Sequence, residues 1–327
     1  KLGVDGGSKD SIIKLAKEIA DGKHGKYDSL LIAHKDKLLF ESYFLRGRVN
    51  GLHFQASATK GYTSLVVGRA IQLGYLSMDD LNKPVTSFLK GLDPTKFVDG
   101  VENITLHQAM TMRSGLRFTD EEQKAFGSNP DKFKGIDQIQ AFFELSEPIT
   151  PESQSFKYQG PDPRITMQVV DAVVPGSAKD FIKNELFDKL GANYTWKNDR
   201  SGVPQGENGG YITSRDMLKL GGLMVNKGQL ANEQLISTKY LAKAASGITK
   251  AMEDWHPDDF NYGYFMYQTD VAVGDKSYVA KIVWGGGGQH IITFEELDLV
   301  VVTTGHDMDD KIMAQVAKVI VPAFIKS

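Results

Sequence analysis

The separation of helical from β-rich sequence along the chain is the feature that most limits its possible folds. A helical pattern over residues 8–22 and a predicted hairpin over 29–44 come first. Helical periodicity then prevails from residue 57 to about 250, and β-rich runs follow until a final helix over 309–324. Such segregation predicts an α+β fold rather than an alternating α/β fold.

The β-rich runs after residue 260 are short and are separated by Gly, Asp and Glu, which is typical of consecutive antiparallel strands. They cover residues 262–268, 278–284, 289–294 and 299–304. We expect these strands and the first hairpin to form one sheet flanked by the terminal helices. This predicts a discontinuous sheet domain, residues 1–56 plus 255–327, with a mostly helical domain, residues 57–254, inserted into it.

Composition excludes several classes of function. Lys plus Arg number 38 and Asp plus Glu 41, so the formal charge is −3, which gives no general attraction to nucleic acid or anionic lipid. Cysteine is absent, which excludes disulfides, thiolate metal sites and a cysteine nucleophile. The sequence contains no His-x-x-x-His pattern and no long apolar run. We therefore expect no metal, no organic cofactor and no membrane span.

Ser57-Ala58-Thr59-Lys60 is the pattern with the clearest chemical meaning, although Ser-x-x-Lys also occurs at Ser11–Lys14 and Ser87–Lys90. Ser57 differs because it opens a strongly apolar helix, where Ser and Lys three positions apart share one face. Free N–H groups at a helix start favour a developing oxyanion, and a buried lysine can act as a base. In the alternative interpretation, Ser57 only caps the helix and Lys60 lies on the surface.

Segments on both sides of this pattern resemble the serine β-lactamase/penicillin-binding-protein superfamily. The similar segments occur in the family's order, at residues 54–63, 74–85, 104–116, 208–217, 288–291 and 296–302. The chain is most similar to the branch of class C β-lactamases, family VIII carboxylesterases, D-aminopeptidases and nylon-oligomer hydrolases, over about residues 25–325. The resemblance implies a β-lactamase/transpeptidase-like fold with its site between the sheet and the helical region.

The resemblance also implies a catalytic tyrosine in a Tyr-x-Asn motif, and Tyr158 fits by position. Tyr158 would carry the proton between Ser57, Lys60 and the leaving group, if nearby cations lower the pKa of its phenol. Gly160 stands where the family has asparagine, so a substrate-orienting amide is missing or is replaced by that of Gln159. The alternative for Tyr158 is a packed aromatic side chain whose hydroxyl is satisfied.

The third family motif, Lys-Thr-Gly or His-x-Gly, corresponds to Trp284-Gly285-Gly286, which is similar to the Trp-x-Gly of the esterase branch. Glycines here would let the strand approach the acyl group and aim an N–H at the oxyanion, opposite that of Ser57. Gly287 or Gly288 is expected to be that donor, and His290 could border the pocket. The alternative is a flexible turn between two strands.

The missing lysine of this motif favours certain substrates. Trp284, Gly285 and Gly286 offer no cation or hydroxyl to a substrate carboxylate, which favours neutral esters or amides over β-lactams. With Gln159 and His290, these residues are the expected substrate contacts.

The sequence therefore predicts a serine hydrolase that cleaves small esters or amides through an acyl-enzyme on Ser57, with Lys60 and Tyr158. A β-lactamase or D-Ala-type peptidase remains open, and so does a non-catalytic binding or scaffold protein. No basic-then-apolar leader pattern is visible at the start. The family suggests a periplasmic or secreted location, with a cytoplasmic one as the alternative, and the oligomeric state stays open.

Overall fold

The computed structural model describes residues 9–325 and confirms the α+β fold. Its main sheet is antiparallel, with the strand order β2-β1-β13-β12-β11-β10-β9-β8. The strands are β1 (Tyr27–His34), β2 (Lys37–Tyr43), β8 (Thr249–Lys250), β9 (Asn261–Tyr262), β10 (Tyr267–Val273), β11 (Lys276–Gly285), β12 (Gln289–Phe294) and β13 (Leu299–Gly305). Because β1 pairs with β13, the two ends of the chain form one sheet, as predicted.

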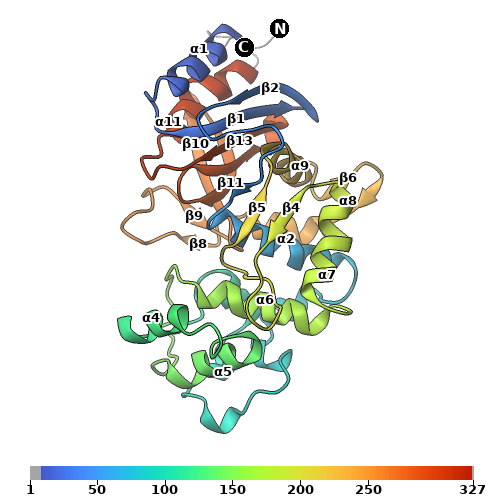
Figure 1. The fold of residues 1–327 in the computed structure, drawn as a ribbon, viewed down its shortest axis with the longest axis vertical. Helices are drawn as coiled ribbons and strands as arrows, with labels where there is room; N and C mark the ends of the chain where they lie inside the picture. The colour runs from blue at the N-terminus through green and yellow to red at the C-terminus, as the bar shows by residue number, and fades with distance from the viewer. Residues whose placement is uncertain (1–8, 326–327) are drawn as a thin grey trace.

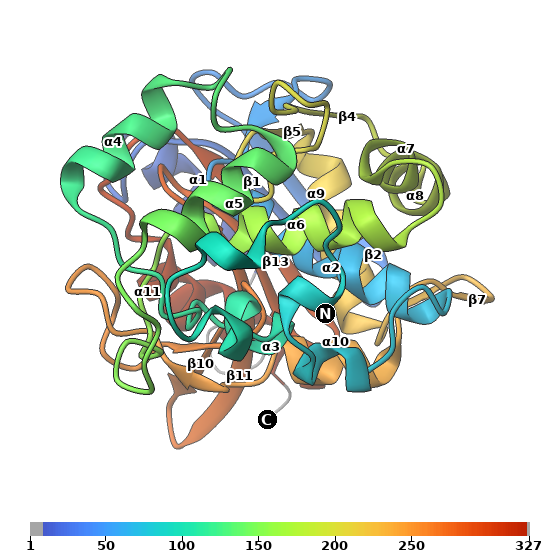
Figure 2. The same ribbon diagram turned by 90° about the horizontal axis from the view of Figure 1, so that it is seen from below.

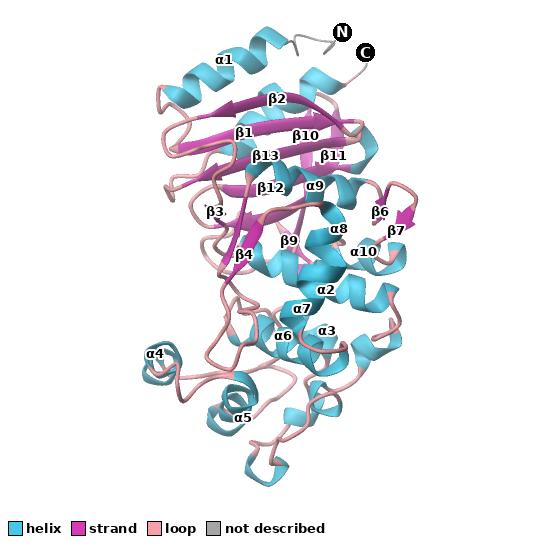
Figure 3. Ribbon diagram, turned by 45° about the vertical axis from the view of Figure 1, so that its right-hand side comes forward, coloured by secondary structure: helices cyan, strands magenta, loops and turns pink. Residues whose placement is uncertain are grey.

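Helices cover both faces of this sheet (Figures 1 and 3). On one face lie α1 (Lys9–Ala20) and the C-terminal helix, which consists of α11 (Ile312–Gln315), η7 (Val316–Ile320) and η8 (Val321–Phe324). On the other face, α9 (Ser214–Val225) packs against β12 and β13, and α2 (Ala58–Gln72) packs against β11. Residues 58–70 of α2 are all buried, so α2 is the central helix between the sheet and the helical region.

The helical region lies beyond α2, and Figure 2 looks onto it. Its α-helices are α3 (Leu106–Met110), α4 (Asp120–Ser128), α5 (Gly135–Leu145), α6 (Pro161–Val173), α7 (Ala178–Ile182), α8 (Asp188–Leu190) and α10 (Thr238–Ala244). Shorter turns are η1 (Asp79–Asn82), η2 (Val85–Ser87), η3 (Pro94–Lys96), η4 (Val101–Asn103), η5 (Lys183–Phe187) and, between β12 and β13, η6 (Glu295–Leu297). Within residues 9–325, no helix combines the length and the apolar character needed to cross a membrane.

Two small sheets complete the fold. One joins β3 (His53–Phe54) to β5 (Gly210–Ile212) and β4 (Tyr194–Trp196), and the other pairs β6 (Gln229–Leu230) with β7 (Glu233–Gln234). The β3–β5 pairing ties the segment before Ser57 to a strand far along the chain. The main sheet also takes in β8, which lies inside the range 57–254 expected to be helical.

Two predicted elements differ from the observed ones for local reasons. The predicted strand 262–268 is divided into β9 and β10, because the chain turns between them at Phe265, whose φ is +58°. The predicted final helix 309–324 becomes regular only at Ile312 and ends in a 3₁₀ turn containing Pro322, which lacks the N–H that an α-helix needs.

Candidate active site

Ser57 lies at the start of α2, directly after a strained turn at residues 55–56. The N–H of Gln55 donates to the Gly210 carbonyl over 2.9 Å, which fastens the turn to β5. Ala56 then has φ +46°, in the left-handed region that side chains adopt at a cost, and Ser57 is already helical at φ −70°. Within the described residues the Ser57 N–H meets no acceptor. The turn thus leaves this N–H free at the positive end of the helix.

Two glycines let this end of α2 lie directly on β11. A Cβ atom at Gly61 would come within 2.7 Å of Val283, and one at Gly285 would come within 2.1 Å of the Gln55 carbonyl oxygen. Gly285 is therefore the point at which the strand meets the turn carrying Ser57. The glycine that sequence reasoning placed here has a direct steric reason.

Lys60 lies beneath Ser57 and is only 5% exposed. Its Nζ donates to Ser57 Oγ over 2.8 Å and to the main-chain oxygen of Glu207 over 2.9 Å. The Ser57 side chain caps no helix N–H. The alternative of a capping serine with a surface lysine is therefore wrong. Among the described residues no carboxylate pairs with Lys60, so its Nζ contacts two oxygens and an aromatic ring.

That ring belongs to Tyr158, whose centre lies 4.7 Å from Lys60 Nζ. The backbone N–H of Tyr158 donates to Glu253 Oε1 over 2.7 Å. Within the described chain, no hydrogen bond joins the Tyr158 hydroxyl to Ser57 or Lys60. Lys60 and Tyr158 are thus brought together as predicted, but they meet through the face of the ring.

An aromatic cluster surrounds Tyr158. Trp255 packs edge-on at 5.2 Å between ring centres, and His256 and Tyr262 also contact the ring. Burial, followed by the neighbouring Tyr158 and Tyr262, raises the pKa of Tyr267 well above its usual value. His256 hydrogen-bonds the Tyr267 hydroxyl over 2.8 Å, and burial lowers the pKa of His256 to about 4. The cluster therefore favours neutral side chains next to the site.

The remaining glycines of the run lead away from Ser57. Gly286 is exposed, and Gly287 and Gly288 form the turn to β12 with φ of +95° and +100°. A Cβ at Gly288 would lie 2.9 Å from Tyr27, and the Gly287 carbonyl accepts from the Asp307 N–H over 3.3 Å. The expected oxyanion donors Gly287 and Gly288 thus pack toward the β1 and β13 side, whereas Gly285 makes the close approach to the turn at Ser57.

Trp284 and His290, two expected substrate contacts, are both held by Asp310. Trp284 Nε1 donates to Asp310 Oδ2 over 3.2 Å, and its ring stacks on that of His290. His290, 2% exposed, lies 2.9 Å from Asp310 Oδ2 and 2.9 Å from Thr303 Oγ1. Burial works to raise the pKa of Asp310, but His290 and a bond from Tyr27 bring it down to about 2. His290 is thus anchored inside the protein by Asp310 and Thr303, while Trp284 stays half-buried.

Gln159 is directed into the helical region. Its Nε2 donates to Asp162 Oδ1 over 2.9 Å and to the Leu116 carbonyl over 3.3 Å. Asp162 also accepts from the N–H and hydroxyl of Ser114. Burial raises the pKa of Asp162 to about 6 despite these donors. This network explains the Ser-Gly-Leu segment as a support for the residues around Tyr158, and it holds the Gln159 Nε2 group toward Asp162.

Sequence reasoning missed Glu207 and Arg164. Glu207 supplies the carbonyl that accepts from Lys60, and Arg164 Nε donates to its Oε1 over 2.8 Å. The available signal was the position of Glu207, directly before the Asn208–Met217 segment that carries the family resemblance. Gly210 in that segment donates its N–H to Thr59 Oγ1 over 3.1 Å, which brings residue 207 beside α2.

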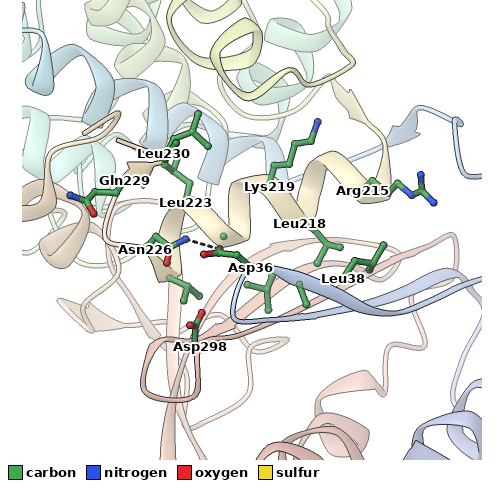
Figure 4. A pocket seen from close by; sticks show the side chains of 15 residues that line it. Asp36, Leu38, Arg215, Leu218, Lys219, Leu223, Asn226, Gln229, Leu230 and Asp298 are labelled. Atoms are coloured by element: carbon green, nitrogen blue, oxygen red, sulfur yellow. Dashed lines mark hydrogen bonds between the residues drawn. The ribbon is translucent and has the colours of Figure 1, made fainter. Parts of the chain in front are cut away.

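A cavity of about 600 Å³ lies elsewhere, between α9, the β1–β2 turn and the segment around residue 230 (Figure 4). Its charged lining residues are largely paired, as in the 2.7 Å hydrogen bond from Asn226 to Asp36. It contains none of the predicted site residues. In the described range, no cluster of His, Cys, Asp and Glu could hold a metal ion.

The Beta-lactamase family model matches residues 15–319. The chain therefore belongs to the Beta-lactamase family, and the resemblance inferred from its motifs is confirmed. Comparison with curated proteins finds no match.

Solved structures share the fold at low sequence identity. A protein of Bacillus anthracis assigned as a 6-aminohexanoate-dimer hydrolase is 18% identical with a TM-score of 0.71, over 94% of this chain and 79% of its own. EstCE1, a hydrolase with promiscuous acyltransferase activity, is 13% identical with a TM-score of 0.72, over 97% and 99%. A D-stereospecific amidohydrolase from Streptomyces sp. is 14% identical with a TM-score of 0.67, over 92% and 96%. These likenesses establish the β-lactamase/transpeptidase-like fold.

Proposed function

We propose that this protein is a serine hydrolase that cleaves ester or amide bonds of neutral acyl compounds through an acyl-enzyme on Ser57. The observation that carries the proposal is the 2.8 Å hydrogen bond from buried Lys60 Nζ to Ser57 Oγ. A serine hydroxyl needs an adjacent base to become a nucleophile, and Lys60 is the titratable group in contact with it. The names of two structural relatives, an amidohydrolase and a hydrolase with acyltransferase activity, agree with this chemistry.

The reaction follows the usual two steps of acyl transfer. Lys60, as the free amine, takes the proton of Ser57 while Oγ bonds to the carbonyl carbon and the carbonyl oxygen becomes an oxyanion. When this intermediate collapses, the bond to the leaving group breaks and the leaving group takes the proton held by Lys60. Water then attacks the acyl carbon and gives a proton to the Lys60 amine. The bond to Ser57 Oγ breaks, Oγ takes that proton back, and the acid is released.

The oxyanion needs two N–H donors. One is the free N–H of Ser57 at the start of α2. For the second, we propose the end of β11 at Gly285 and Gly286 in place of Gly287 and Gly288, because the strand meets the nucleophile turn at Gly285.

The preferred polarity of the substrate is inferred from Trp284 and from the aromatic side chains around Tyr158. Trp284 holds the place of the family's strand cation, and the Tyr158 surroundings are aromatic. These side chains suit an acyl group without a charge. Trp255, 54% exposed, could stack on such a group from the open side.

Labelling with a fluorophosphonate tests the proposal. We expect a single adduct on Ser57 by intact mass and peptide mapping, absent in Ser57→Ala and strongly reduced in Lys60→Ala. Turnover of p-nitrophenyl esters is then compared with that of a chromogenic cephalosporin. Faster, Ser57-dependent cephalosporin turnover would replace the esterase assignment by a β-lactamase. A folded wild-type protein that takes no label would support a binding role.

A further inference from the structure

Glu207 contacts two residues of the site in different ways. Its backbone carbonyl accepts a hydrogen bond from Lys60, and its side chain forms an ion pair with Arg164. Its main-chain oxygen accepts from Lys60 Nζ over 2.9 Å, and its Oε1 accepts from Arg164 Nε over 2.8 Å. Glu207 is 6% exposed, and the Arg164 side chain is 26% exposed. A shift of the Glu207 side chain would therefore move the carbonyl that holds the ammonium of Lys60.

The pair lies where an asparagine side chain would project from position 160. An ideal Cβ at Gly160 would be 3.9 Å from Nε and Nη2 of Arg164 and 3.9 Å from Cγ of Glu207. Gly160 comes directly before α6, and Arg164 stands one turn into that helix, its N–H donating to the Gly160 carbonyl. The ion pair thus occupies the direction in which the family's Tyr-x-Asn motif carries its amide.

The segment around Glu207 contacts both α2 and α6 through Gly206. The Gly206 carbonyl accepts from Thr63 Oγ1 on α2 over 2.8 Å. A Cβ at Gly206 would come within 2.3 Å of the Pro163 carbonyl on α6. Position 207 is consequently set by both helices, one carrying Lys60 and the other carrying Arg164.

The stability of an ion pair gives little reason for this arrangement. Apolar residues of similar volume often replace buried ion pairs without loss of stability. The contact of Glu207 with Lys60 supplies another role for the pair.

We propose that Arg164 and Glu207 are positioning residues for Lys60: Arg164 fixes the Glu207 side chain, and this places the carbonyl that orients Nζ toward Ser57. They act through Lys60 and touch no reacting atom. The pair thus orients Lys60 at the place where the family's asparagine side chain is missing, because position 160 is glycine. This inference rests on the proposed hydrolase function.

The test must distinguish two effects of the pair on Lys60: the position it gives to the side chain, and the electric field of its two charges. Glu207→Gln removes a negative charge near Lys60 and Arg164→Gln removes a positive one, so the single variants alter the field in opposite directions. The double variant Arg164→Gln/Glu207→Gln keeps the net charge and removes the charged anchor. We expect the double variant to lose about tenfold in kcat and in the rate of phosphonate labelling, with KM within about twofold.

The pH dependence of kcat gives a readout that a purely structural role would not move. We expect the pH profile of kcat to shift to lower pH in Glu207→Gln, to higher pH in Arg164→Gln, and to return near its wild-type position in the double variant, while kcat stays low. Arg164→Lys, which keeps the charge without the side-on Nε contact, should show an intermediate kcat. It also serves as the test if the glutamine variants fail to fold.

The control is the double variant Arg215→Gln/Glu41→Gln, which removes another Arg–Glu pair, joined at 2.6 Å, outside the site. It should keep wild-type kcat. Wild-type kcat in Arg164→Gln/Glu207→Gln, or in Arg164→Lys if the former does not fold, would overturn the positioning role while leaving the hydrolase standing. Absence of labelling in the wild-type protein would instead contradict the hydrolase function itself.

Discussion

Lys60 meets Tyr158 through the face of the ring, with Nζ 4.7 Å from the ring centre and no hydrogen bond to the hydroxyl. The sequence interpretation made the Tyr158 hydroxyl a proton carrier between Ser57 and the leaving group. The observed contact instead is typical of a cation–π interaction, which stabilises an ammonium in a desolvated place. The hydroxyl lies on the side of Tyr267, whose pKa it helps to raise after burial.

Replacing Tyr158 separates the ring from the hydroxyl. We expect Tyr158→Phe to lose less than about tenfold in the labelling rate of Ser57, because the ring under Lys60 remains. Tyr158→Ala should lose about a hundredfold or more, since Lys60 then loses the ring that packs against its Nζ. Both rates are measured by intact mass against time. If Tyr158→Phe and Tyr158→Ala lose the same factor in labelling rate, the hydroxyl is the important group and carries the proton.

Two neighbouring glycines should respond differently to alanine. At Gly285 a Cβ would overlap the Gln55 carbonyl at 2.1 Å, whereas at Gly286 it would only touch the flexible end of Met308 at 3.4 Å. We expect Gly285→Ala to lower Tm by about 5 °C and to slow labelling of Ser57, because α2 must move off β11. Gly286→Ala should leave Tm within about 1 °C of wild type. Equal Tm values for the two variants would argue against the close approach at Gly285.

Asp310 should stabilise the protein in a pH-dependent way. Burial opposes ionisation, yet His290 and Tyr27 bring the pKa of Asp310 to about 2, below its ordinary value of 3.8. Its contribution is therefore complete above about pH 4 and disappears as the pH falls through 2. We expect Asp310→Asn to lose about 2 kcal/mol of unfolding free energy at pH 7, measured with urea. A difference from wild type that does not shrink between pH 4 and pH 2 would contradict this assignment.

His256 should also destabilise the protein on acidification, but at a higher pH than Asp310. Burial lowers its pKa to about 4 from 6.5, so the folded protein binds fewer protons than the unfolded chain between these values. Stability is thus fully present above pH 6.5 and is lost as the pH falls toward 4. We expect wild type to lose up to about 2 kcal/mol more than His256→Gln between pH 7 and pH 4.5. If the unfolding free energies of wild type and His256→Gln change in parallel with pH, His256 must be exposed to water in the folded protein.

Local patterns in the sequence were sufficient for much of the fold. The apolar period of helices and the alternation of strands depend on neighbours a few residues apart, so β12 and α1 were predicted closely. The Ser-x-x-Lys spacing is equally local, because one helical turn brings Ser57 and Lys60 together in any fold that contains the helix. The ordered motifs then indicated the family, which the match over residues 15–319 confirms.

The sequence by itself thus determined the fold class and the pairing of Ser57 with Lys60. The tertiary structure alone decided which groups complete the site. Glu207 is 147 residues from Lys60, and Arg164 is 43 from Glu207, so no local pattern reports these contacts. The same holds for Gly285, which is the closest of four consecutive glycines to the Ser57 turn only because α2 packs on β11 there. Helix and strand periodicities are short-range properties, whereas the surroundings of a reacting group arise from packing between distant elements.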